Sequence, residues 1–246
     1  MRGVIRGEEG KRAESLVSVS KATDSSMDGH TLIWDGYTGS AMKVFVDLFC
    51  GLGGASEAFV GTDWRVIRID NNPDLTEHVK GMWVLDMMKP VDVLETLTGY
   101  LHGYGHVTEM VVWASPPCIN FSDADPERDE KDHDLTLLNN TVLLIGWLND
   151  RFNVTSYWIE NVRGAIRSFT PVLGDYRQRI GPFFLWGRFV PIACITAEVH
   201  RHRKPFNKTN SRTHLRSNIH AKIPYALSKS VLLTVERQLS LLEWVE

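Results

Sequence analysis

The sequence predicts an α/β fold in which a mostly parallel sheet is covered by helices on both faces. Short runs of apolar and β-forming residues alternate with longer stretches that can be helical, which is the pattern of right-handed βαβ units. Each short run ends in Asp, Gly, Pro or Asn, as strands do where the chain turns. The runs are almost continuously apolar, which is typical of strands that are buried on both faces.

Six runs are expected to contain strands, and they lie within residues 43–54, 64–73, 82–88, 109–118, 156–162 and 183–187. Helices are expected within residues 54–60, 90–101 and 135–152, and a last amphipathic helix within residues 223–239. Residues 41–246 are therefore predicted to form one domain. Residues 1–40 are rich in Gly, Ser and charge, which predicts a flexible N-terminal extension, with an ordered cap over the main domain as the alternative.

Composition limits the class of protein. A chain of 246 residues can bury its own core without disulfides. Three cysteines are too few for a disulfide scaffold, so we expect a reducing, cytoplasmic compartment and thiols available for chemistry. No apolar run reaches the roughly 18 residues that span a bilayer, so no membrane partner is expected. The net charge of −3 excludes a globally basic nucleic-acid-binding protein but not a local basic face.

A glycine-rich turn follows the first expected strand, in the segment from Asp47 to Gly54. A helix expected to start near Ala55 would offer free amides for a carboxylate or phosphate, although such a turn is often only a tight turn. The second expected strand ends in Asp70, 19 residues after Gly51, where a carboxylate suits a ribose diol. The third ends in Asp86, which can accept a hydrogen bond from an adenine amine. Together these features predict an adenosine ligand, and the close spacing of the glycines favours one without a pyrophosphate.

Two further motifs follow the fourth and fifth expected strands. Ser-Pro-Pro-Cys ends at Cys118, and the two prolines fix the backbone before the thiol. The fifth strand ends in Glu160 and Asn161, 42 residues after the cysteine. Because the carboxyl ends of parallel strands gather at one edge, Glu160 and Cys118 are expected to be neighbours. A cysteine is a nucleophile only when its thiolate is stabilised; by itself it is more often a small buried residue.

These motifs, in this order over about residues 43–187, resemble the DNA cytosine-5 methyltransferases. The short C-terminal half is similar to that of the short methylases of bacteriophages. The resemblance implies a Rossmann-like S-adenosylmethionine-dependent methyltransferase fold, with S-adenosylmethionine as cofactor, no metal, and double-stranded DNA as partner. It also implies a cytoplasmic enzyme, in the bacterial host if the gene belongs to a phage. The oligomeric state is left open.

The resemblance also implies roles for individual residues. Cys118 would attack carbon-6 of a flipped cytosine, and Glu160 would hold the ring at nitrogen 3 and the exocyclic amine. Asn161 would position Glu160 and the loop that carries Pro117. Arg179 or Arg177 would hold the cytosine carbonyl or a phosphate. The cofactor would contact Asp47, Phe49, Gly51, Leu52, Gly53, Asp70, Asn71, Asp86 and Pro116. The last helix would return Ser228 or Ser230 to the cofactor. The sequence departs from the family around residues 176–182, where Pro182 stands in place of an expected arginine.

Charge is segregated in two blocks. Residues 123–134 carry seven acids against two bases, and residues 199–235 contain eight Lys and Arg but no acid. We expect DNA contacts from Arg177, Arg201, Arg203, Lys204, Arg212 and Arg216. The basic recognition segment, about residues 188–222, is too short for a core of its own, which predicts short or relaxed sequence specificity. The alternatives are an RNA cytosine-5 methyltransferase, an enzyme that uses a modified methyl donor, and a catalytically inactive DNA-binding relative.

Overall fold

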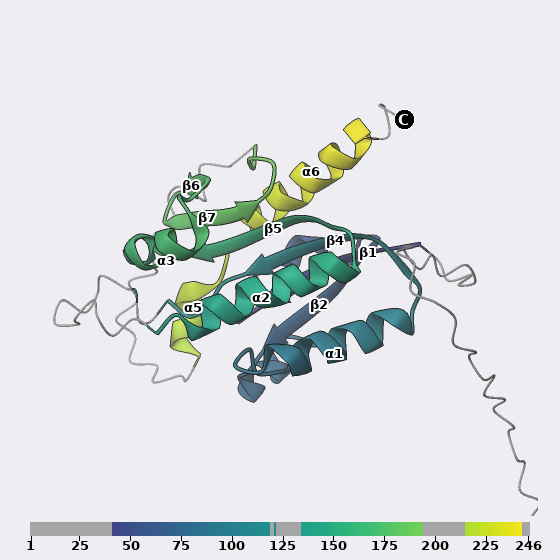
Figure 1. The fold of residues 1–246 in the computed structure, drawn as a ribbon, viewed down its shortest axis with the longest axis horizontal. Helices are drawn as coiled ribbons and strands as arrows, with labels where there is room; N and C mark the ends of the chain where they lie inside the picture. The colour runs from purple at the N-terminus through teal and green to yellow at the C-terminus, as the bar shows by residue number, and fades with distance from the viewer. Residues whose placement is uncertain (1–40, 119–120, 122–133, 194–214, 243–246) are drawn as a thin grey trace, which may run out of the picture. The chain divides into compact units, whose positions relative to one another are not determined.

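A seven-stranded sheet with helices on both faces forms the centre of the computed structural model (Figure 1), which describes residues 41–118, 121, 134–193 and 215–242. The strands are β1 (Ala41–Leu48), β2 (Trp64–Asp70), β3 (Trp83–Val84), β4 (His106–Ala114), β5 (Val154–Asn161), β6 (Gln178–Ile180) and β7 (Phe183–Arg188). The α-helices are α1 (Pro90–His102), α2 (Thr136–Arg151), α3 (Ile166–Leu173), α5 (Arg216–Ala221) and α6 (Tyr225–Leu242). Short 3₁₀ turns lie at η1 (Glu57–Phe59), η2 (Pro73–Glu77) and η4 (Arg163–Ala165).

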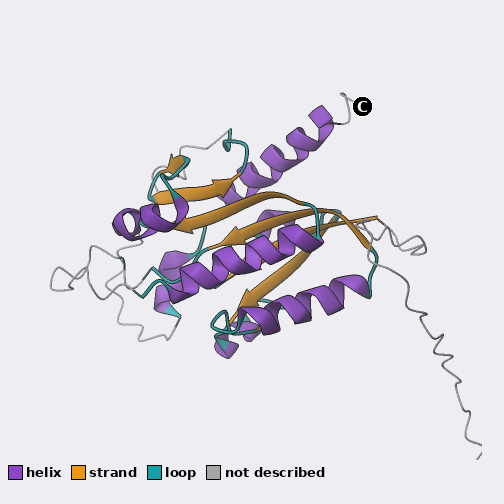
Figure 2. Ribbon diagram, viewed as in Figure 1, coloured by secondary structure: helices purple, strands orange, loops and turns teal. Residues whose placement is uncertain are grey.

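The strand order is β3-β2-β1-β4-β5-β7-β6. The first five strands along the chain pair in parallel, and β7 pairs antiparallel with both β5 and β6. Figure 2 shows that the arrowheads of β2, β4 and β5 reach the same edge of the sheet while β7 runs the other way. The predicted α/β fold, a mostly parallel sheet with helices on both faces, is confirmed, and the predicted site residues fall at its carboxyl edge.

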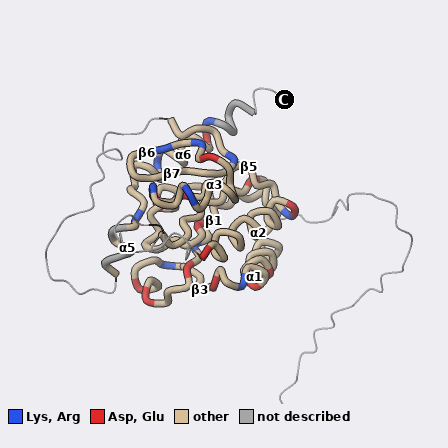
Figure 3. Tube along the Cα trace, turned by 60° about the vertical axis from the view of Figure 1, so that its left-hand side comes forward, with Lys and Arg blue, Asp and Glu red and all other residues tan. Residues whose placement is uncertain are grey.

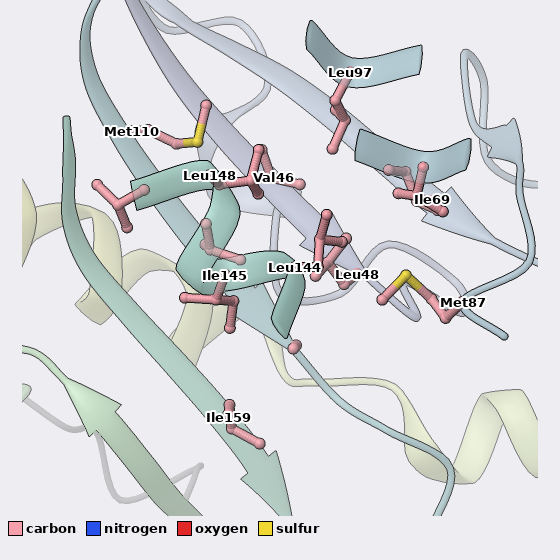
Figure 4. Packing of buried hydrophobic residues seen from close by; sticks show 14 of the residues in the cluster. Val46, Leu48, Ile69, Met87, Leu97, Met110, Leu144, Ile145, Leu148 and Ile159 are labelled. Carbon is pink, nitrogen blue, oxygen red and sulfur yellow. The ribbon is translucent and has the colours of Figure 1, made fainter. Parts of the chain in front are cut away.

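Each face of the sheet has its own core. On one face α1, α2 and α3 cover residues such as Val46, Ile69 and Met110, and Figure 4 shows Leu144, Ile145 and Leu148 of α2 packed onto these strands. On the other face η1 and α6 cover the stacked rings of Trp113 and Trp158, whose centroids are 6.0 Å apart. Burial on both faces explains why the strands are continuously apolar. Successive side chains point to opposite faces of the sheet, and each face packs against a core.

The predicted helix over residues 54–60 is wrong: only the single turn η1 forms there. The hydroxyl of Ser56 donates a hydrogen bond to the carbonyl oxygen of Gly53 at 3.3 Å, and the hydroxyl of Ser228 donates to that of Ala55 at 2.7 Å. Val60 is already extended, and Gly61 follows with a φ of +82°. Seven residues between two glycines are too few for a stable helix, because nucleation is costly.

The third strand is shorter than predicted. It pairs only at Trp83 and Val84, so Asp86 lies two residues beyond the strand instead of at its end. Asp86 is exposed, and its carboxylate accepts a hydrogen bond from the amide of Met88 at 2.9 Å, which closes a turn before α1.

Several predictions concern residues outside the described ranges. These are the N-terminal extension (1–40), nearly all of the acidic block (123–133), and the recognition segment from 194 to 214, with Arg201, Arg203, Lys204 and Arg212. Arg216 begins α5, and only its backbone is described. None of the helices in the described part is long and apolar enough to cross a membrane.

Two glycines test the packing of the sheet and of α2. A Cβ at Gly187 in β7 would overlap the carbonyl oxygen of Tyr157, and the φ of Gly187 is +124°. Gly187→Ala is therefore expected to lower the free energy of unfolding by about 2 kcal/mol or more. Gly146→Ala in α2, where no atom lies within 4 Å of the new Cβ, is expected to raise it by about 0.5–1 kcal/mol. Urea unfolding measures both, and equal effects of the two substitutions would contradict the packing described.

Candidate active site

Main-chain hydrogen bonds join the turns that leave the carboxyl edge of the sheet. The amide of Ser115, just after β4, donates to the carbonyl of Leu48 at the end of β1, at 3.2 Å. The amide of Cys50 donates to Ile69 of β2 at 3.0 Å, and the amide of Leu85 donates to Asp70 at 3.0 Å. The segments that the sequence assigns to the cofactor and to the reacting cysteine are therefore adjacent, as parallel strand ends require.

The glycine-rich turn after β1 is held in a left-handed backbone conformation. Phe49, Gly51 and Gly53 have φ values of +57°, +51° and +68°. Asp70 fixes the turn, because one carboxylate oxygen accepts from the amide of Gly51 at 2.9 Å and the other from the amide of Asn72 at 3.0 Å. A left-handed Phe is strained and is tolerated where the surroundings fix the backbone, which is a common feature of ligand sites.

The two glycines beside this turn differ in their surroundings. A Cβ added at Gly51 would meet no atom within 4 Å, so the backbone there faces open space. A Cβ at Gly54 would overlap the carbonyl oxygen of Ile223, which precedes α6. One side of the turn is therefore open to a ligand, and the other is closed by the C-terminal segment.

A buried polar chain lies beneath the turn. The hydroxyl of Ser56 donates to the carboxylate of Asp47 at 2.6 Å and accepts from the Nε of Arg68 at 2.8 Å. Asp47 is 1% exposed, and burial raises its pKa to about 6, against the opposing effects of the Ser56 hydrogen bond and of Arg68. The three side chains come from β1, β2 and the segment before η1, so they fasten these elements together under the glycines.

The other predicted cofactor residues lie at different depths. Leu52 is half-buried against the small cluster around Cys50, and Asn71 is exposed next to Asp70. Asp86 is exposed on the far side of Asp70, and Pro116 is buried after β4. The structure therefore places these residues around the same edge, with Asp70 bonded directly to the glycine turn and Asp86 separated from that turn by Asp70.

Asn161 holds the proline turn from the end of β5. Its side-chain Nδ2 donates to the carbonyl oxygen of Pro116 at 3.0 Å, and its Oδ1 accepts from the amide of Val162 at 2.9 Å. Asn161 is 1% exposed, and its bond to Pro116 is buried. Asn161 therefore holds the proline turn that precedes Cys118, and its role in positioning Glu160 stays a prediction.

Glu160 contacts the same turn from the opposite face of β5. Its buried carboxyl group accepts a hydrogen bond from Ser115, whose Oγ also accepts from the indole nitrogen of Trp113 at 2.9 Å. Burial raises the pKa of Glu160 to about 7, and the Ser115 hydrogen bond partly opposes that shift. A carboxyl group with such a pKa is protonated in a large fraction of molecules at neutral pH, so it can donate a proton to a ligand.

Cys118 lies four residues after the end of β4 and is half-buried. Its carbonyl oxygen accepts from the amide of Phe121 at 2.9 Å, and the buried ring of Phe121 packs edge-on against Phe169 of α3, with centroids 5.1 Å apart. The segment that carries the thiol is thus anchored before Cys118 by Asn161 and after it by Phe121.

Arg177 and Arg179 lie at the outer edge of the sheet, beside and on β6. Arg179 donates from Nε to the carbonyl of Gly181 at 3.0 Å, with its guanidinium 5.2 Å from the ring centroid of Phe184. Phe184 pairs with both Arg179 and Asn161, so the Cα atoms of those two residues are about 10 Å apart across two strand spacings. Arg177 stacks on Phe189 at 5.5 Å. Both arginines are exposed, and their catalytic and DNA-binding roles stay predictions. Figure 3 shows basic and acidic residues scattered over the described part of the chain.

Sequence reasoning missed Ser56, Arg68 and the contact of Ser115 with Glu160. The available signal for Arg68 was a charge inside an otherwise apolar strand run, Val-Ile-Arg-Ile-Asp. The two serines of α6 differ in their contacts. Ser228 accepts from the amide of Ala58 at 3.0 Å and donates to the carbonyl of Ala55, next to the glycine turn, whereas Ser230 donates to a carbonyl of its own helix.

No protein-family model and no curated protein matches this sequence. The chain is partly similar to solved structures. One of these is the crystal structure of the Dnmt2 methyltransferase of S. pombe, with 20% sequence identity and a TM-score of 0.33. The match covers 50% of this chain and 37% of that chain, so the similarity is partial on both sides.

The raised pKa of Glu160 makes stability depend on pH. The folded pKa, about 7, lies above the ordinary 4.5, so folding favours the protonated form and stability falls as pH rises from about 4.5 through 7. Glu160→Gln removes this cost while keeping an acceptor for Ser115. The stability of the variant relative to the wild type is expected to increase by about 2.5 kcal/mol from pH 5 to pH 8.5, measured by urea unfolding at both pH values. Glu95→Gln, at an exposed position on α1, is the control, and a pH-independent difference for Glu160→Gln would contradict the burial effect.

The anchoring role of Asn161 predicts a large loss of stability. Asn161→Ala leaves the buried carbonyl of Pro116 and the half-buried amide of Val162 without their partner and is expected to cost about 2–4 kcal/mol in the free energy of unfolding. Asn153→Ala is the matched control, because its Nδ2 also donates to a main-chain carbonyl, that of Thr108 at 3.1 Å, but at an exposed position. For the control we expect a loss of less than about 1 kcal/mol in the free energy of unfolding. Similar losses for both variants would contradict the anchoring role of Asn161.

Proposed function

We propose that this protein is a cytosine-5 methyltransferase that transfers a methyl group from S-adenosylmethionine to a flipped cytosine of double-stranded DNA. The observation that carries the proposal is the joining of the Cys118 segment to the end of β5. On one face of β5, Asn161 donates a hydrogen bond to the carbonyl of Pro116. On the other face, the carboxyl group of Glu160 accepts a hydrogen bond from Ser115. A thiol and a carboxyl group with a pKa near neutrality are thus brought to one edge of the sheet.

The chemistry needs those two groups because cytosine is a poor nucleophile at carbon-5. Addition of the Cys118 thiolate to carbon-6 moves electron density through the ring toward nitrogen 3, where protonated Glu160 can donate its proton. Carbon-5 is then nucleophilic enough to accept a methyl group. Methyl transfer leaves S-adenosylhomocysteine. Loss of the carbon-5 proton to water, expulsion of the Cys118 thiolate and return of the nitrogen 3 proton to the Glu160 carboxylate then restore the aromatic ring. The base must leave the duplex for this reaction, since neither face of a stacked cytosine is accessible.

The residues of the glycine turn fit S-adenosylmethionine, which when bound supplies an electrophilic methyl group. The open space beside Gly51 allows a ligand to approach the backbone closely, because a side chain there would occupy it. Asp70 lies beside that space, and each of its carboxylate oxygens has a second lone pair for a ribose hydroxyl. Asp86, exposed beyond Asp70, would take the adenine amine.

The proposed DNA contacts rest on charge and on the resemblance to the DNA-modifying family. Arg177 and Arg179 present exposed guanidinium groups beside and on the edge strand β6, and the basic segment follows β7 along the chain. Phosphate contacts of this kind give affinity without sequence information. We therefore propose relaxed sequence specificity, and substrates for the assay should be of mixed sequence.

Methyl transfer from labelled S-adenosylmethionine tests the proposal. Duplex DNA is expected to acquire label at carbon-5 of cytosine, and Cys118→Ser is expected to lower the rate at least about a thousandfold, because nucleophilic addition is lost. Cys194→Ser, at the third cysteine of the chain, is the matched control and should retain transfer.

Three outcomes would contradict parts of the proposal. Label on RNA of the same sequence but not on DNA would show that the substrate is RNA. Transfer to neither nucleic acid would overturn the proposed activity. Transfer that survives Cys118→Ser would overturn the mechanism. Duplex DNA containing 5-fluorocytosine is expected to remain covalently bound to the wild type, because fluorine cannot leave as a proton does, and not to Cys118→Ser.

A further inference from the structure

Arg68 is a charged residue between two buried isoleucines of β2, and its guanidinium group faces the glycine turn. It lies between Ile67 and Ile69, which are 2% and 0% exposed, and it pairs in register with Asp47 of β1. The guanidinium lies against Gly53, where an added Cβ would be 3.0 Å from Nε and 3.2 Å from Cζ. A half-buried cation is costly, so its place beneath this turn calls for an explanation.

Most of the hydrogen-bonding capacity of Arg68 is unused. Its Nε donates to the hydroxyl of Ser56 at 2.8 Å, and within the described part of the chain this is the single hydrogen bond that the guanidinium makes. Arginine has five N–H donors, so four remain for solvent or a ligand. Within the described residues, no carboxylate forms a direct ion pair with Arg68. Asp47 is connected to it only through the hydroxyl of Ser56, and the carboxylate of Asp70 accepts from main-chain amides.

The absence of a regular helix at η1 changes what can bind an anion here. The sequence predicts that free amides at the start of a helix near Ala55 serve this purpose, but only a three-residue 3₁₀ turn forms. Such a turn has almost no macrodipole, because the dipole is a sum over aligned peptide units. Arg68 is a full positive charge on the neighbouring strand, at the same turn.

We infer that Arg68 binds the carboxylate at the methionine end of the cofactor, opposite the end whose ribose is held by Asp70. This inference rests on the proposed function. A guanidinium group pairs with a carboxylate through two parallel N–H···O bonds, which gives strength and orientation. Asp70 follows Arg68 by two residues on β2, so one strand would hold the ligand at two points, and Ser56 orients the guanidinium through Nε.

Two ligands that differ only in the carboxylate test the inference in the intact wild-type chain. Titration calorimetry is expected to give a Kd for S-adenosylmethionine at least tenfold lower than for decarboxylated S-adenosylmethionine. Arg68→Met is expected to weaken binding of the first ligand at least tenfold and of the second by less than twofold, and Arg68→Lys should give an intermediate loss. Arg65→Met is the control on the same strand. Arg65 stacks on Tyr104 at 4.0 Å and donates to the hydroxyl of Tyr100, so the ratio of the two Kd values should not change.

Equal weakening of both ligands by Arg68→Met would overturn the inference, because it would mean that Arg68 only supports the turn through Ser56. If that variant does not fold, as judged by circular dichroism, the comparison of the two ligands on the wild type decides: equal Kd values overturn the inference. Failure of the proposed function is distinguishable, since the wild type would then bind neither ligand or would bind them without methylating a nucleic acid. Binding of neither ligand would overturn both.

Discussion

The parallel pairing of β1, β4 and β5 is the constraint on which the candidate site depends. Leu48, Ala114 and Ile159 lie in register across the three strands, so the chain leaves each strand at the same edge. This register is firmly set because both faces are buried, and a slip by one residue would turn apolar side chains out of each core. The glycine turn, the proline turn and the Glu160–Asn161 pair are therefore brought together by the packing of residues that take no part in the chemistry.

Side chains from neighbouring strands then fix turns that the sheet only brings close. Asp70 holds the amide of Gly51, Asn161 holds the carbonyl of Pro116, and Ser228 of α6 holds the main chain on either side of Ser56. Each bond joins a buried or half-buried polar group to main chain far away in sequence. The same burial that shields these bonds raises the pKa values of Asp47 and Glu160, so anchoring and proton chemistry have one physical origin.

The local motifs were predictable because they depend on short stretches of chain. Most strand runs, the turn at Gly51 and the positions of Asp70 and Glu160 follow from apolar runs that end in polar or glycine residues. The helix over residues 54–60 was not predictable in this way, since Ser56 and Ser228 compete for its carbonyl oxygens and Ser228 is 173 residues from Ala55. The antiparallel direction of β7 likewise has no local signal, because an apolar run such as Phe-Phe-Leu-Trp reads the same in either orientation.

The sequence by itself determined the fold class, the order of the strand-end motifs and the identity of the candidate thiol and carboxyl groups, because periodicity and turn chemistry are local properties. Only the tertiary structure decided which partners these groups have. Ser115 hydrogen-bonds to Glu160, and Asn161 hydrogen-bonds to the carbonyl of Pro116. Ser56 connects Arg68 to Asp47. Arg179 lies two strand spacings from Asn161. Burial and the pKa shifts that follow from it depend on neighbours that are distant along the chain, which the order of the residues alone does not contain.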